Sequence, residues 1–551
     1  MKTSKLKKIC AVVLTAAVGI SVLTGCGGSS TGDKKTASKQ ELNFNLGADP
    51  KTLDPALNQA VDSSIILVNA FEGLYKVDKD NKAIPGVAKS YDLSADGTVY
   101  TFHLQDGLKW SNGDPIKASD FEYAWKRVMN PETAAEYAYQ MEYIKGAKEY
   151  TAGKGSVDQV GVKATDDKTL QVTLASPCSY FLNLTAFPCY FPVDQKVVEG
   201  NKDWANSAAT YVSNGPFKMT DYKIKDGLVL EKNENYYAKD SIKLDKINVK
   251  FVTEDTSAWA SYKSGQFDMV YNVPKSEVQA AIKDGSAKVI NLLSNYFYSV
   301  NVSDKAKEVD PNAAKVLADP KVRKALNLAI DRQSIVDNVT KGGQTPAHSF
   351  VPTGIIGADG KDFAGKTYFD PKGNVEEAKK LLAEAGYPDG KGFPSVVLMF
   401  NPEKQHGIIA QAVQDMWKKN LGIDVQIQNQ EWKVLIATRN DKKYELARDG
   451  WVADYTDPMT FLDMLQSTSG QNNSGYNNPE YDKLIVAAKA EQDANKRLEM
   501  LHKAEDILME DMPVITLFYD TQPMGIKDTI KGLKTSPLGY IYFDEAYMEG
   551  K

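Results

Sequence analysis

The stretch SADGTVYTFHLQDGLKWSNGDPIKASDFEYAWKR, residues 94–127, carries the pattern that decides the fold. Apolar and polar side chains alternate through residues 99–104, which predicts a hairpin strand with one buried face. Residues 112–115, Asn-Gly-Asp-Pro, predict a turn, and residues 118–120 are expected to cap a helix that contains Trp125. A strand, a turn and an amphipathic helix in so short a stretch favour an α/β or α+β body whose sheets are covered by helices.

The same mixture continues on both sides of this stretch. Residues 41–49 predict a strand, and the Asp-Pro turns in residues 49–58 predict an irregular exit from it. Residues 319–339 and 374–386 have the apolar spacing of helices, and Gly386 is expected in the position that closes the second one. No internal repeat is visible, which argues against a solenoid or an array.

The composition is that of a globular protein and excludes several other classes. The chain has 551 residues, of which 42% are apolar and 25% charged, and this length implies two to four domains. Lys plus Arg is 66 against 72 for Asp plus Glu, so the net charge is −6 and the balance gives no reason to expect nucleic acid as a partner. Because nearly all of the cations are Lys, each Arg is a candidate for a specific role.

Residues 1–25 have the pattern of an export signal. Residues 2–8 carry Lys and no acid, and an apolar run follows in residues 9–23. This run of about 15 residues is short of the roughly 20 that a helix needs to cross a bilayer. Residues 26–40 are polar or small after the initial Cys, so we expect a flexible tether.

The end of the apolar run, Leu23-Thr24-Gly25-Cys26, resembles the bacterial lipobox. This resemblance implies cleavage before Cys26 and diacylation of its sulfur. The protein would then be lipid-anchored at the extracytoplasmic face of the cell membrane. The alternative is a plain secretory signal in which Cys26 falls at the cleavage position by chance.

Motifs of the common enzyme classes are missing in the structural setting that they require. There is no HExxH or His-x-His spacing, and no GxSxG, GxxxxGK[ST] or GxGxxG stretch directly follows a predicted strand. The sequence therefore predicts no metal site and no cofactor, and we expect no catalytic residues and no enzymatic activity.

Cys178 and Cys189 are the two cysteines of the folded body, in a compartment that favours disulfides. The residues between them have apolar spacing suited to a short helix. Ten helical residues separate the two Cα atoms by about 15 Å, which exceeds the ~7 Å limit for a bridge. We therefore expect two buried thiols.

Four long segments, taken in order, resemble the extracellular solute-binding proteins of peptide ABC importers, most closely the oligopeptide-binding branch. They are residues 94–127, 214–237, 319–336 and 417–433, and the similarity extends over residues 41–551. The resemblance implies a two-lobed α/β fold of the periplasmic-binding-protein type with an additional inserted domain, in which paired crossing strands join the lobes and enclose the ligand between them.

The family also implies domain limits and partners. The first lobe would comprise residues 41–71, 195–297 and 536–551, the inserted domain residues 72–194, and the second lobe residues 298–535. The implied partners are an oligopeptide ligand, an ABC permease with its ATPases, and the membrane through the lipid anchor. We expect a monomer.

The segment YELARDGWVADYTDP, residues 444–458, contains the charged and aromatic residues that a peptide-binding site needs. Asp454 lies among apolar and aromatic residues, where an ionised carboxylate needs a cation to offset its desolvation. The family resemblance assigns Asp454 the salt bridge to the peptide α-ammonium. The alternative is a carboxylate that caps a turn or helix before Pro458.

Further positions follow from the resemblance by register. It implies that Arg448 and Arg439 neutralise peptide carboxylates, which suits the bidentate guanidinium. The other implied ligand-binding residues are Trp432 and Trp451 as pocket walls, Gly450 beside them, His406 and Asn401 for longer peptides, and Tyr271, Asn272 and Val61 for backbone contacts. Two alternatives stay open, a surface position for His406 and a core position for Trp432. Val61 is expected in the loop after the first strand.

Two departures from the family limit what can be carried over. Gln59 stands where some members have an acid near the ligand, and Val452 stands where some have a disulfide-forming cysteine. The sequence therefore predicts capture of peptides of two to several residues and delivery by lobe closure. Dipeptides, nickel chelates, haem or oligosaccharides remain alternative ligands of the same fold, and a secreted peptide hydrolase is the alternative from another class.

Overall fold

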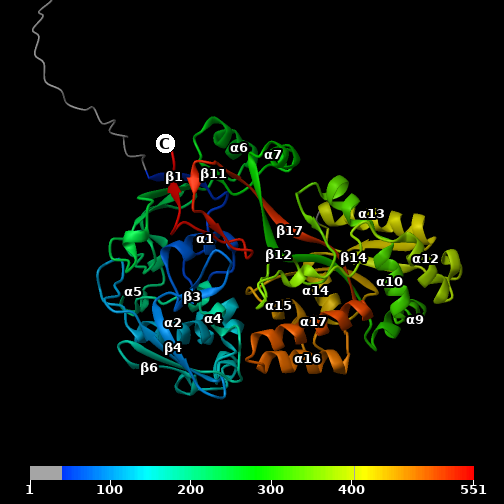
Figure 1. The fold of residues 1–551 in the computed structure, drawn as a ribbon, viewed down its shortest axis with the longest axis horizontal. Coiled ribbons are helices and arrows are strands. Elements are labelled where there is room, and N and C mark those ends of the chain that lie inside the picture. Colours follow the sequence, from blue (N-terminus) through cyan, green and yellow to red (C-terminus); the bar gives the residue numbers. More distant parts are fainter. Residues whose placement is uncertain (1–39, 403, 551) are drawn as a thin grey trace, which may run out of the picture. The chain divides into compact units, whose positions relative to one another are not determined.

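A mixed sheet of 11 strands runs through residues 40–402 and 404–550, the part of the chain that this computed structural model describes (Figure 1). Its strands are β1 (Glu41–Asn45), β8 (Phe217–Lys223), β9 (Gly227–Lys232), β10 (Lys246–Lys250), β11 (Met269–Val270), β12 (Ala287–Val300), β13 (Thr345–Pro346), β14 (Val396–Phe400), β15 (Val425–Asn429), β16 (Leu446–Val452) and β17 (Val514–Ile526). A second, antiparallel sheet consists of β4 (Ala88–Leu93), β5 (Val99–Leu104), β6 (Val162–Asp166) and β7 (Thr169–Thr173). Three two-stranded ribbons pair β2 (Tyr75–Val77) with β3 (Ala83–Pro85), β18 (Ile530–Lys531) with β21 (Tyr547–Met548), and β19 (Lys534–Thr535) with β20 (Ile541–Tyr542).

Helices connect these strands. The α-helices are α1 (Val61–Ala70), α2 (Ala118–Met129), α3 (Ala147–Thr151), α4 (Phe181–Leu184), α5 (Gln195–Val198), α6 (Asp255–Ser264), α7 (Val278–Asp284), α8 (Ala306–Val309), α9 (Pro311–Leu317), α10 (Pro320–Leu328), α11 (Arg332–Ser334), α12 (Val375–Glu384), α13 (Lys404–Leu421), α14 (Trp432–Asn440), α15 (Met459–Leu462), α16 (Pro479–Ala490) and α17 (Ala494–Asp511). Short 3-10 turns include η2 (Glu136–Met141), and η7 (Ile335–Thr340) is a π-helix.

The longest strands, β12 and β17, pair antiparallel in the middle of the large sheet. Their register runs from Ala287 opposite Gly525 to Ser299 opposite Val514. Strands β16, β14 and β15 continue the sheet beyond β12, and β11, β1, β10, β9 and β8 continue it beyond β17. Helices α10, α12 and α13 pack on the β14 end with their own apolar core (Figure 1). The β12–β17 pair therefore joins two α/β regions that are built from different parts of the chain.

An irregularity interrupts this pair near its middle. Asn291 lies opposite Thr521 and Asn295 lies opposite Tyr519, so three residues of β12 face Asp520 alone. The Ser294 hydroxyl in this bulge donates a hydrogen bond of 2.7 Å to the Asp520 carboxylate. A bulge of this kind changes the direction in which a side chain points, compared with a regularly paired strand.

Several predicted elements are confirmed, with shifted ends. The alternating stretch forms β5, and Gly386 has the left-handed φ of +97° that closes α12. The N-cap of α2 is Lys117 and lies one residue before the predicted group, because the Asp120 carboxylate accepts the Lys117 backbone N–H at 2.8 Å. Val61 is the first residue of α1, so its predicted place in a loop is wrong.

The helix predicted over residues 319–339 is interrupted. α10 ends at Leu328, and a new helix begins at Arg332 after Asp331, whose carboxylate accepts the Ser334 N–H at 2.8 Å. Fully buried Arg332 donates to the carbonyls of Asn327, Ile330 and Thr516. These bonds fix the break, because the guanidinium satisfies carbonyls that a continuous helix would have used.

Cys178 and Cys189 are both buried free thiols, as predicted. The segment between them includes the four-residue helix α4. Burial raises the pKa of Cys178 to about 12, and it also raises that of Cys189. Both sulfurs are therefore uncharged and shielded.

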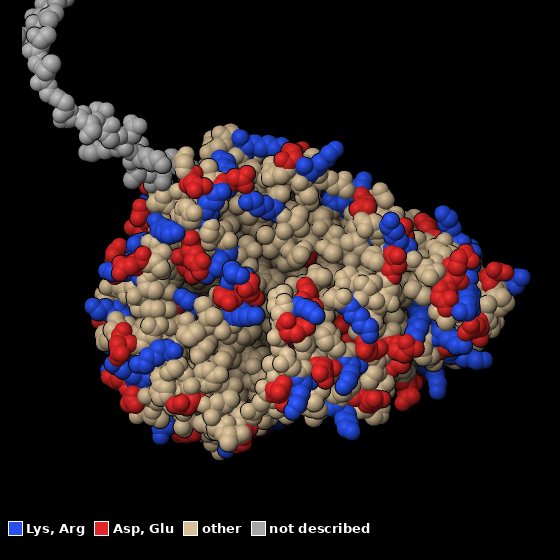
Figure 2. All heavy atoms as spheres, viewed as in Figure 1, with Lys and Arg blue, Asp and Glu red and all other residues tan. Residues whose placement is uncertain are grey.

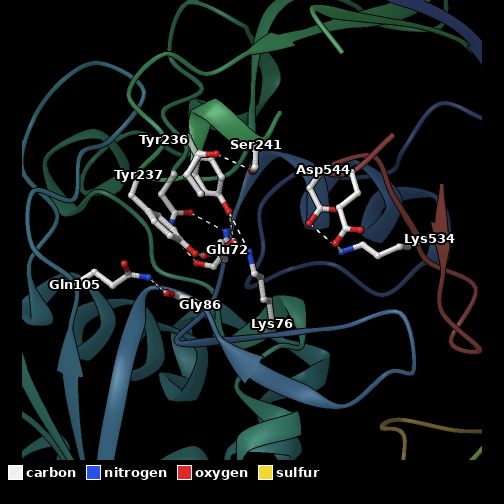
Figure 3. Close-up of polar contacts among 12 residues, drawn as sticks. Glu72, Lys76, Gly86, Gln105, Tyr236, Tyr237, Ser241, Lys534 and Asp544 are labelled. Atoms are coloured by element: carbon white, nitrogen blue, oxygen red, sulfur yellow. Dashed lines mark hydrogen bonds and ion pairs between the residues drawn. The ribbon is translucent and has the colours of Figure 1, made fainter. Parts of the chain in front are cut away.

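The four-stranded sheet lies within the limits expected for the inserted domain, because β4 to β7 fall between residues 88 and 173. Next to it, buried Glu72 accepts hydrogen bonds from the hydroxyls of Tyr236 at 2.5 Å and Tyr237 at 2.7 Å, while Lys534 pairs with Asp544 at 2.9 Å (Figure 3). These contacts tie distant segments to one another. The domain limits themselves stay a prediction.

The surface carries both signs of charge. On the face drawn in Figure 2, Lys and Arg lie among Asp and Glu without a broad field of one sign. In the described part of the chain, no helix is long and apolar enough to cross a membrane. The same residues contain no group of three or more His, Cys, Asp and Glu side chains placed to hold a metal.

Candidate ligand-binding site

Strand β16 carries three of the predicted ligand-binding residues, Arg448, Gly450 and Trp451. It pairs with β12 so that Arg448 lies opposite Tyr298 and Gly450 lies opposite Tyr296. Side chains alternate along a strand, so Arg448 and Gly450 share one face, while Asp449 and Trp451 share the other. A cavity lies near each end of this strand.

The first, which we call the arginine cavity, has a volume of about 510 Å³. Its lining residues come from the sheet face and from helices α13 and α14, and they are Tyr296, Gln344, Asn401, Gln405, His406, Ile409, Trp432, Arg448, Phe518 and Asp520. Four of the predicted residues therefore line one cavity, although more than 40 positions of sequence separate the first from the last.

Arg448 is held here by aromatic rings. Its guanidinium carbon lies 4.9 Å from the ring centre of Tyr296 and 6.0 Å from that of Trp432. Its buried Nε has no hydrogen-bond acceptor among the described residues, and the Asn401 amide oxygen likewise has no donor there. A cavity with an unused hydrogen-bond donor and an unused acceptor suits a ligand group that can both accept and donate hydrogen bonds.

Arg439 differs from Arg448 in that its charge is already neutralised. It forms a buried ion pair with Asp449 and donates to the Arg448 carbonyl at 3.1 Å. Asp449 also accepts bonds from Ser299 and Asn473. Withdrawing Arg439 toward a ligand would strand this carboxylate in the interior, which is costly.

Both open alternatives in this cavity are resolved by burial. His406 is 8% exposed, and its ring lies 5.4 Å from that of Tyr296, so it is not a surface residue. Trp432 is 41% exposed and is therefore not part of the core. Each borders the cavity.

The second cavity, which we call the aspartate cavity, has a volume of about 790 Å³. Its lining residues are Tyr139, Gln140, Glu142, Tyr143, Trp451, Val452, Asp454, Tyr455, Thr460, Asp463, Met464, Gln466, Thr468, Ser469, Gln471 and Lys489. They come from the end of β16 and the following residues, from α16, and from the distant turn η2. Asp454 and Trp451 are the two predicted residues among them.

Asp454 has one hydrogen-bonded partner of note, the Tyr139 hydroxyl, which donates to its carboxylate at 3.1 Å. Burial raises the pKa of Asp454 to about 6, even though this bond lowers it. The carboxylate therefore lacks the cation that would make ionisation easy. Nearby Asp463 has such a partner, because Lys489 lies 3.4 Å from it.

The alternative role of Asp454 as a cap is wrong. Asp457, not Asp454, accepts the N–H of Met459 at the start of α15, and it also pairs with Arg497 at 2.7 Å. The backbone N–H of Asp454 instead donates to the Thr460 hydroxyl at 3.3 Å. The carboxylate of Asp454 is thus left to face the cavity.

Tyr271, Asn272 and Val61 line neither of these cavities. They gather around two glycines: a Cβ on Gly539 would lie 3.0 Å from Val61 and 3.6 Å from the Tyr271 hydroxyl, and a Cβ on Gly47 would lie 3.0 Å from Asn272. The Tyr271 carbonyl accepts a bond of 2.8 Å from Gln522 of β17. The three residues therefore form a separate group beside the joining strands.

Sequence reasoning missed Asp520, Tyr139 and Thr460. Asp520 and Tyr139 are far in sequence from the segment that the family pattern highlights. Thr460 is close to it, and its hydroxyl accepts the Trp451 indole N–H at 3.2 Å. No local motif marks these residues, since their roles arise from pairing and packing alone.

Comparisons with known proteins identify the family of this chain. The family model of bacterial extracellular solute-binding proteins, family 5, matches residues 82–473. The oligopeptide-binding protein OppA of Bacillus subtilis is 39% identical over 99% of this chain and 100% of its own length.

Two solved structures of MppA, a murein tripeptide binding protein, are each 33% identical to this chain. The unliganded open form gives a TM-score of 0.81, with coverage of 93% of this chain and 98% of that one. The other structure, from Escherichia coli, gives 0.69, with coverage of 93% and 99%. By its family match and its coverage of these relatives, the chain belongs to the bacterial extracellular solute-binding proteins of family 5.

Proposed function

We propose that this protein is an extracytoplasmic receptor that binds oligopeptides and delivers them to an ABC permease. The observation that carries the proposal is the pair of opposite charges near the two ends of β16: Arg448 with an unused donor and Asp454 without a cation. A zwitterionic peptide chain complements both. The related binding protein of Bacillus subtilis, named for oligopeptides, supports the same ligand class.

The separation of these charges suits a short peptide. Arg448 and Val452 are four residues apart on one strand, or about 13 Å at a rise of about 3.3 Å per residue. Asp454 lies two residues beyond. An extended peptide spans at most about 3.3–3.6 Å per residue, so about four residues match the span of about 13 Å between Arg448 and Val452.

Each predicted residue then has a role in this proposal. Asp454 receives the α-ammonium, with Trp451 as a wall beside it. Arg448 receives the carboxylate, while His406, Asn401 and Trp432 border the space for longer chains. Gly450 lets β16 lie close to β12 at the edge of the site, because a Cβ there would lie 2.9 Å from the Asn295 carbonyl oxygen. Tyr271, Asn272 and Val61 contact the peptide backbone, and Arg439 positions β16 through Asp449.

Lobe closure is part of the proposal. The chain is more similar to the MppA structure named as the open form than to the other MppA structure, although the sequence identity is the same. A peptide that binds the closed arrangement more tightly would shift the protein toward it. Small-angle scattering should show a smaller radius of gyration with peptide, and identical profiles would count against closure.

Lipid attachment at Cys26 completes the proposal, with the protein acting as a monomer beside its permease. Cys26 lies outside the described residues, so the support is the Leu23-Thr24-Gly25-Cys26 sequence. Two acyl chains give stable attachment, where one would be marginal. Cys26→Ser should release the protein into the medium with its peptide affinity intact, and unchanged membrane association would refute the anchor.

The test of the receptor itself is recovery of its ligand. We expect mass spectrometry of protein incubated with a peptide mixture to find intact peptides of three to five residues bound. Cleaved products would indicate a hydrolase instead, and recovery of a chelate, haem or sugar would place the protein elsewhere in the family.

A further inference from the structure

Asp520 is the carboxylate among the described residues that line the arginine cavity, and nothing in the proposed function uses it. It lies on β17 two residues after Phe518, which also lines this cavity, so the two share one face of the strand. The β12 bulge places three residues opposite it, and Ser294 of this bulge holds the carboxylate with a bond of 2.7 Å. Its direction is therefore fixed by the sheet.

The charges around Asp520 are not joined in an ion pair. Among the described side chains that line the cavity, Arg448 is the cationic group, with His406 as the further titratable one. No ion pair within 4.0 Å joins Asp520 or Arg448 to any other group of the described residues. Burial raises the pKa of Asp520, although the Ser294 bond and Arg448 lower it. A carboxylate and a guanidinium thus line one cavity without pairing.

We propose that Asp520 makes this receptor selective for peptides whose C-terminal residue has a cationic side chain. The inference rests on the proposed function: the α-carboxylate of the last residue pairs with Arg448, and its side-chain cation pairs with Asp520. Because no ion pair joins Arg448 to Asp520, both charges are available to the ligand.

The walls of the cavity fit such a side chain. Phe518 stacks on Tyr296 with ring centres 4.8 Å apart, and Ile409 and Trp432 add apolar surface. The four-carbon stem of lysine packs along surfaces of this kind while its ammonium reaches a polar partner. A neutral side chain would fill the same space but leave Asp520 buried without a cation, which is unfavourable.

The alternative is that Asp520 only tunes Arg448. In that case its charge would weaken the grip of Arg448 on every carboxylate, and its removal would strengthen the binding of all peptides alike. The two roles of Asp520 differ in whether peptide affinity depends on the side chain of the C-terminal peptide residue.

The test compares three tripeptides by calorimetry: Ala-Ala-Lys, Ala-Ala-norleucine, which has the same stem without the charge, and Ala-Ala-Glu. We expect the wild type to bind Ala-Ala-Lys at least tenfold more tightly than Ala-Ala-norleucine and to bind Ala-Ala-Glu most weakly. In Asp520→Asn the first two should become equal. Asp528→Asn removes the same charge at an exposed site, where Asp528 pairs with Lys288, and should keep the tenfold preference.

Equal affinities of the wild type for the lysine and norleucine peptides would overturn the inference. This measurement uses the wild type alone, so it does not depend on whether a variant folds. A preference that persists in Asp520→Asn, or a uniform gain for all three peptides, would also overturn it. In each of these cases the receptor still binds tripeptides, so the proposed function stands. Absence of binding by all three peptides would instead overturn the proposed function itself.

Discussion

The arginine cavity and the aspartate cavity hold their charged groups in different ways. Arg448 lies within a strand, between aromatic rings of the same sheet face and of α14, and the neighbouring Arg439–Asp449 pair is complete without ligand. Asp454 follows the end of β16, and its hydroxyl partner Tyr139 is 315 positions away in the sequence. The proposed carboxylate-binding end is thus built by adjacent strands, whereas the proposed ammonium-binding end depends on two distant segments being in place.

The largest effect should come from removing the group that depends on distant segments. Asp454→Ala should weaken the binding of a free tripeptide by about 3 to 5 kcal/mol, or roughly two to four decades, because the buried α-ammonium would lose its partner. Calorimetry measures this loss. N-acetylation of the peptide should cost a similar amount in the wild type and little more in the variant, since both changes delete the same interaction. Equal binding of free and acetylated peptides by the wild type would show that Asp454 does not bind the peptide α-ammonium.

The two arginines provide the next comparison. Arg448→Met should cost about 1.5 to 3 kcal/mol of peptide affinity, the range for a hydrogen bond to a charged group, and leave the melting temperature nearly unchanged. Arg439→Met should do the opposite: it leaves Asp449 buried without its cation, at a cost of about 3 to 5 kcal/mol of folding free energy. Calorimetry and thermal unfolding separate the two. If Arg439→Met kept full stability and lost peptide binding instead, our assignment would have to be reversed.

The pH dependence of binding should also differ between the two ends. Because the pKa of Asp454 in the free protein is raised to about 6, the carboxylate is ionised above that pH and protonated below it. Affinity for free peptides should therefore fall as the pH drops through 6, by up to about tenfold per pH unit. The raised pKa acts in the opposite direction on stability: above the unfolded value of about 3.9, the free protein should lose stability as the pH rises to 6.

The control for this prediction is Asp454→Asn, whose residual affinity should be flat between pH 5 and 7. A profile that keeps its slope in the variant would point to another titrating group, such as His406 of the arginine cavity. In that case the arginine cavity, and not the aspartate cavity, would set the pH dependence of binding.

The smallest expected effect concerns the distant partner of Asp454. Tyr139→Phe removes one hydrogen bond and should change peptide affinity by about 0.5 to 1.5 kcal/mol. Because the Tyr139 bond lowers the pKa of Asp454, its loss should move the midpoint of the pH profile upward. Titration of the variant measures both. A midpoint that does not move would show that Tyr139 and Asp454 are not in contact in solution.

Local patterns predicted the fold better than they predicted the site. The period of two in β5 and the closing glycine of α12 were visible because each depends on neighbours in sequence. The break at Asp331 was missed, because it depends on Arg332 reaching the Thr516 carbonyl of β17. The residues near β16 came from the family resemblance and not from a local pattern. Asp520 and Tyr139 carry no such signal, since strand pairing and a distant turn bring them to the cavities.

The two buried thiols have a consequence for where this protein can work. Without a disulfide at Cys178 and Cys189, its folding after export requires no oxidant and no disulfide isomerase. With the pKa of Cys178 raised to about 12 and that of Cys189 raised as well, almost none of either thiol is present as the thiolate that peroxides attack. The fold should therefore be equally stable in anaerobic and aerated surroundings, and reducing agents should leave its melting temperature unchanged.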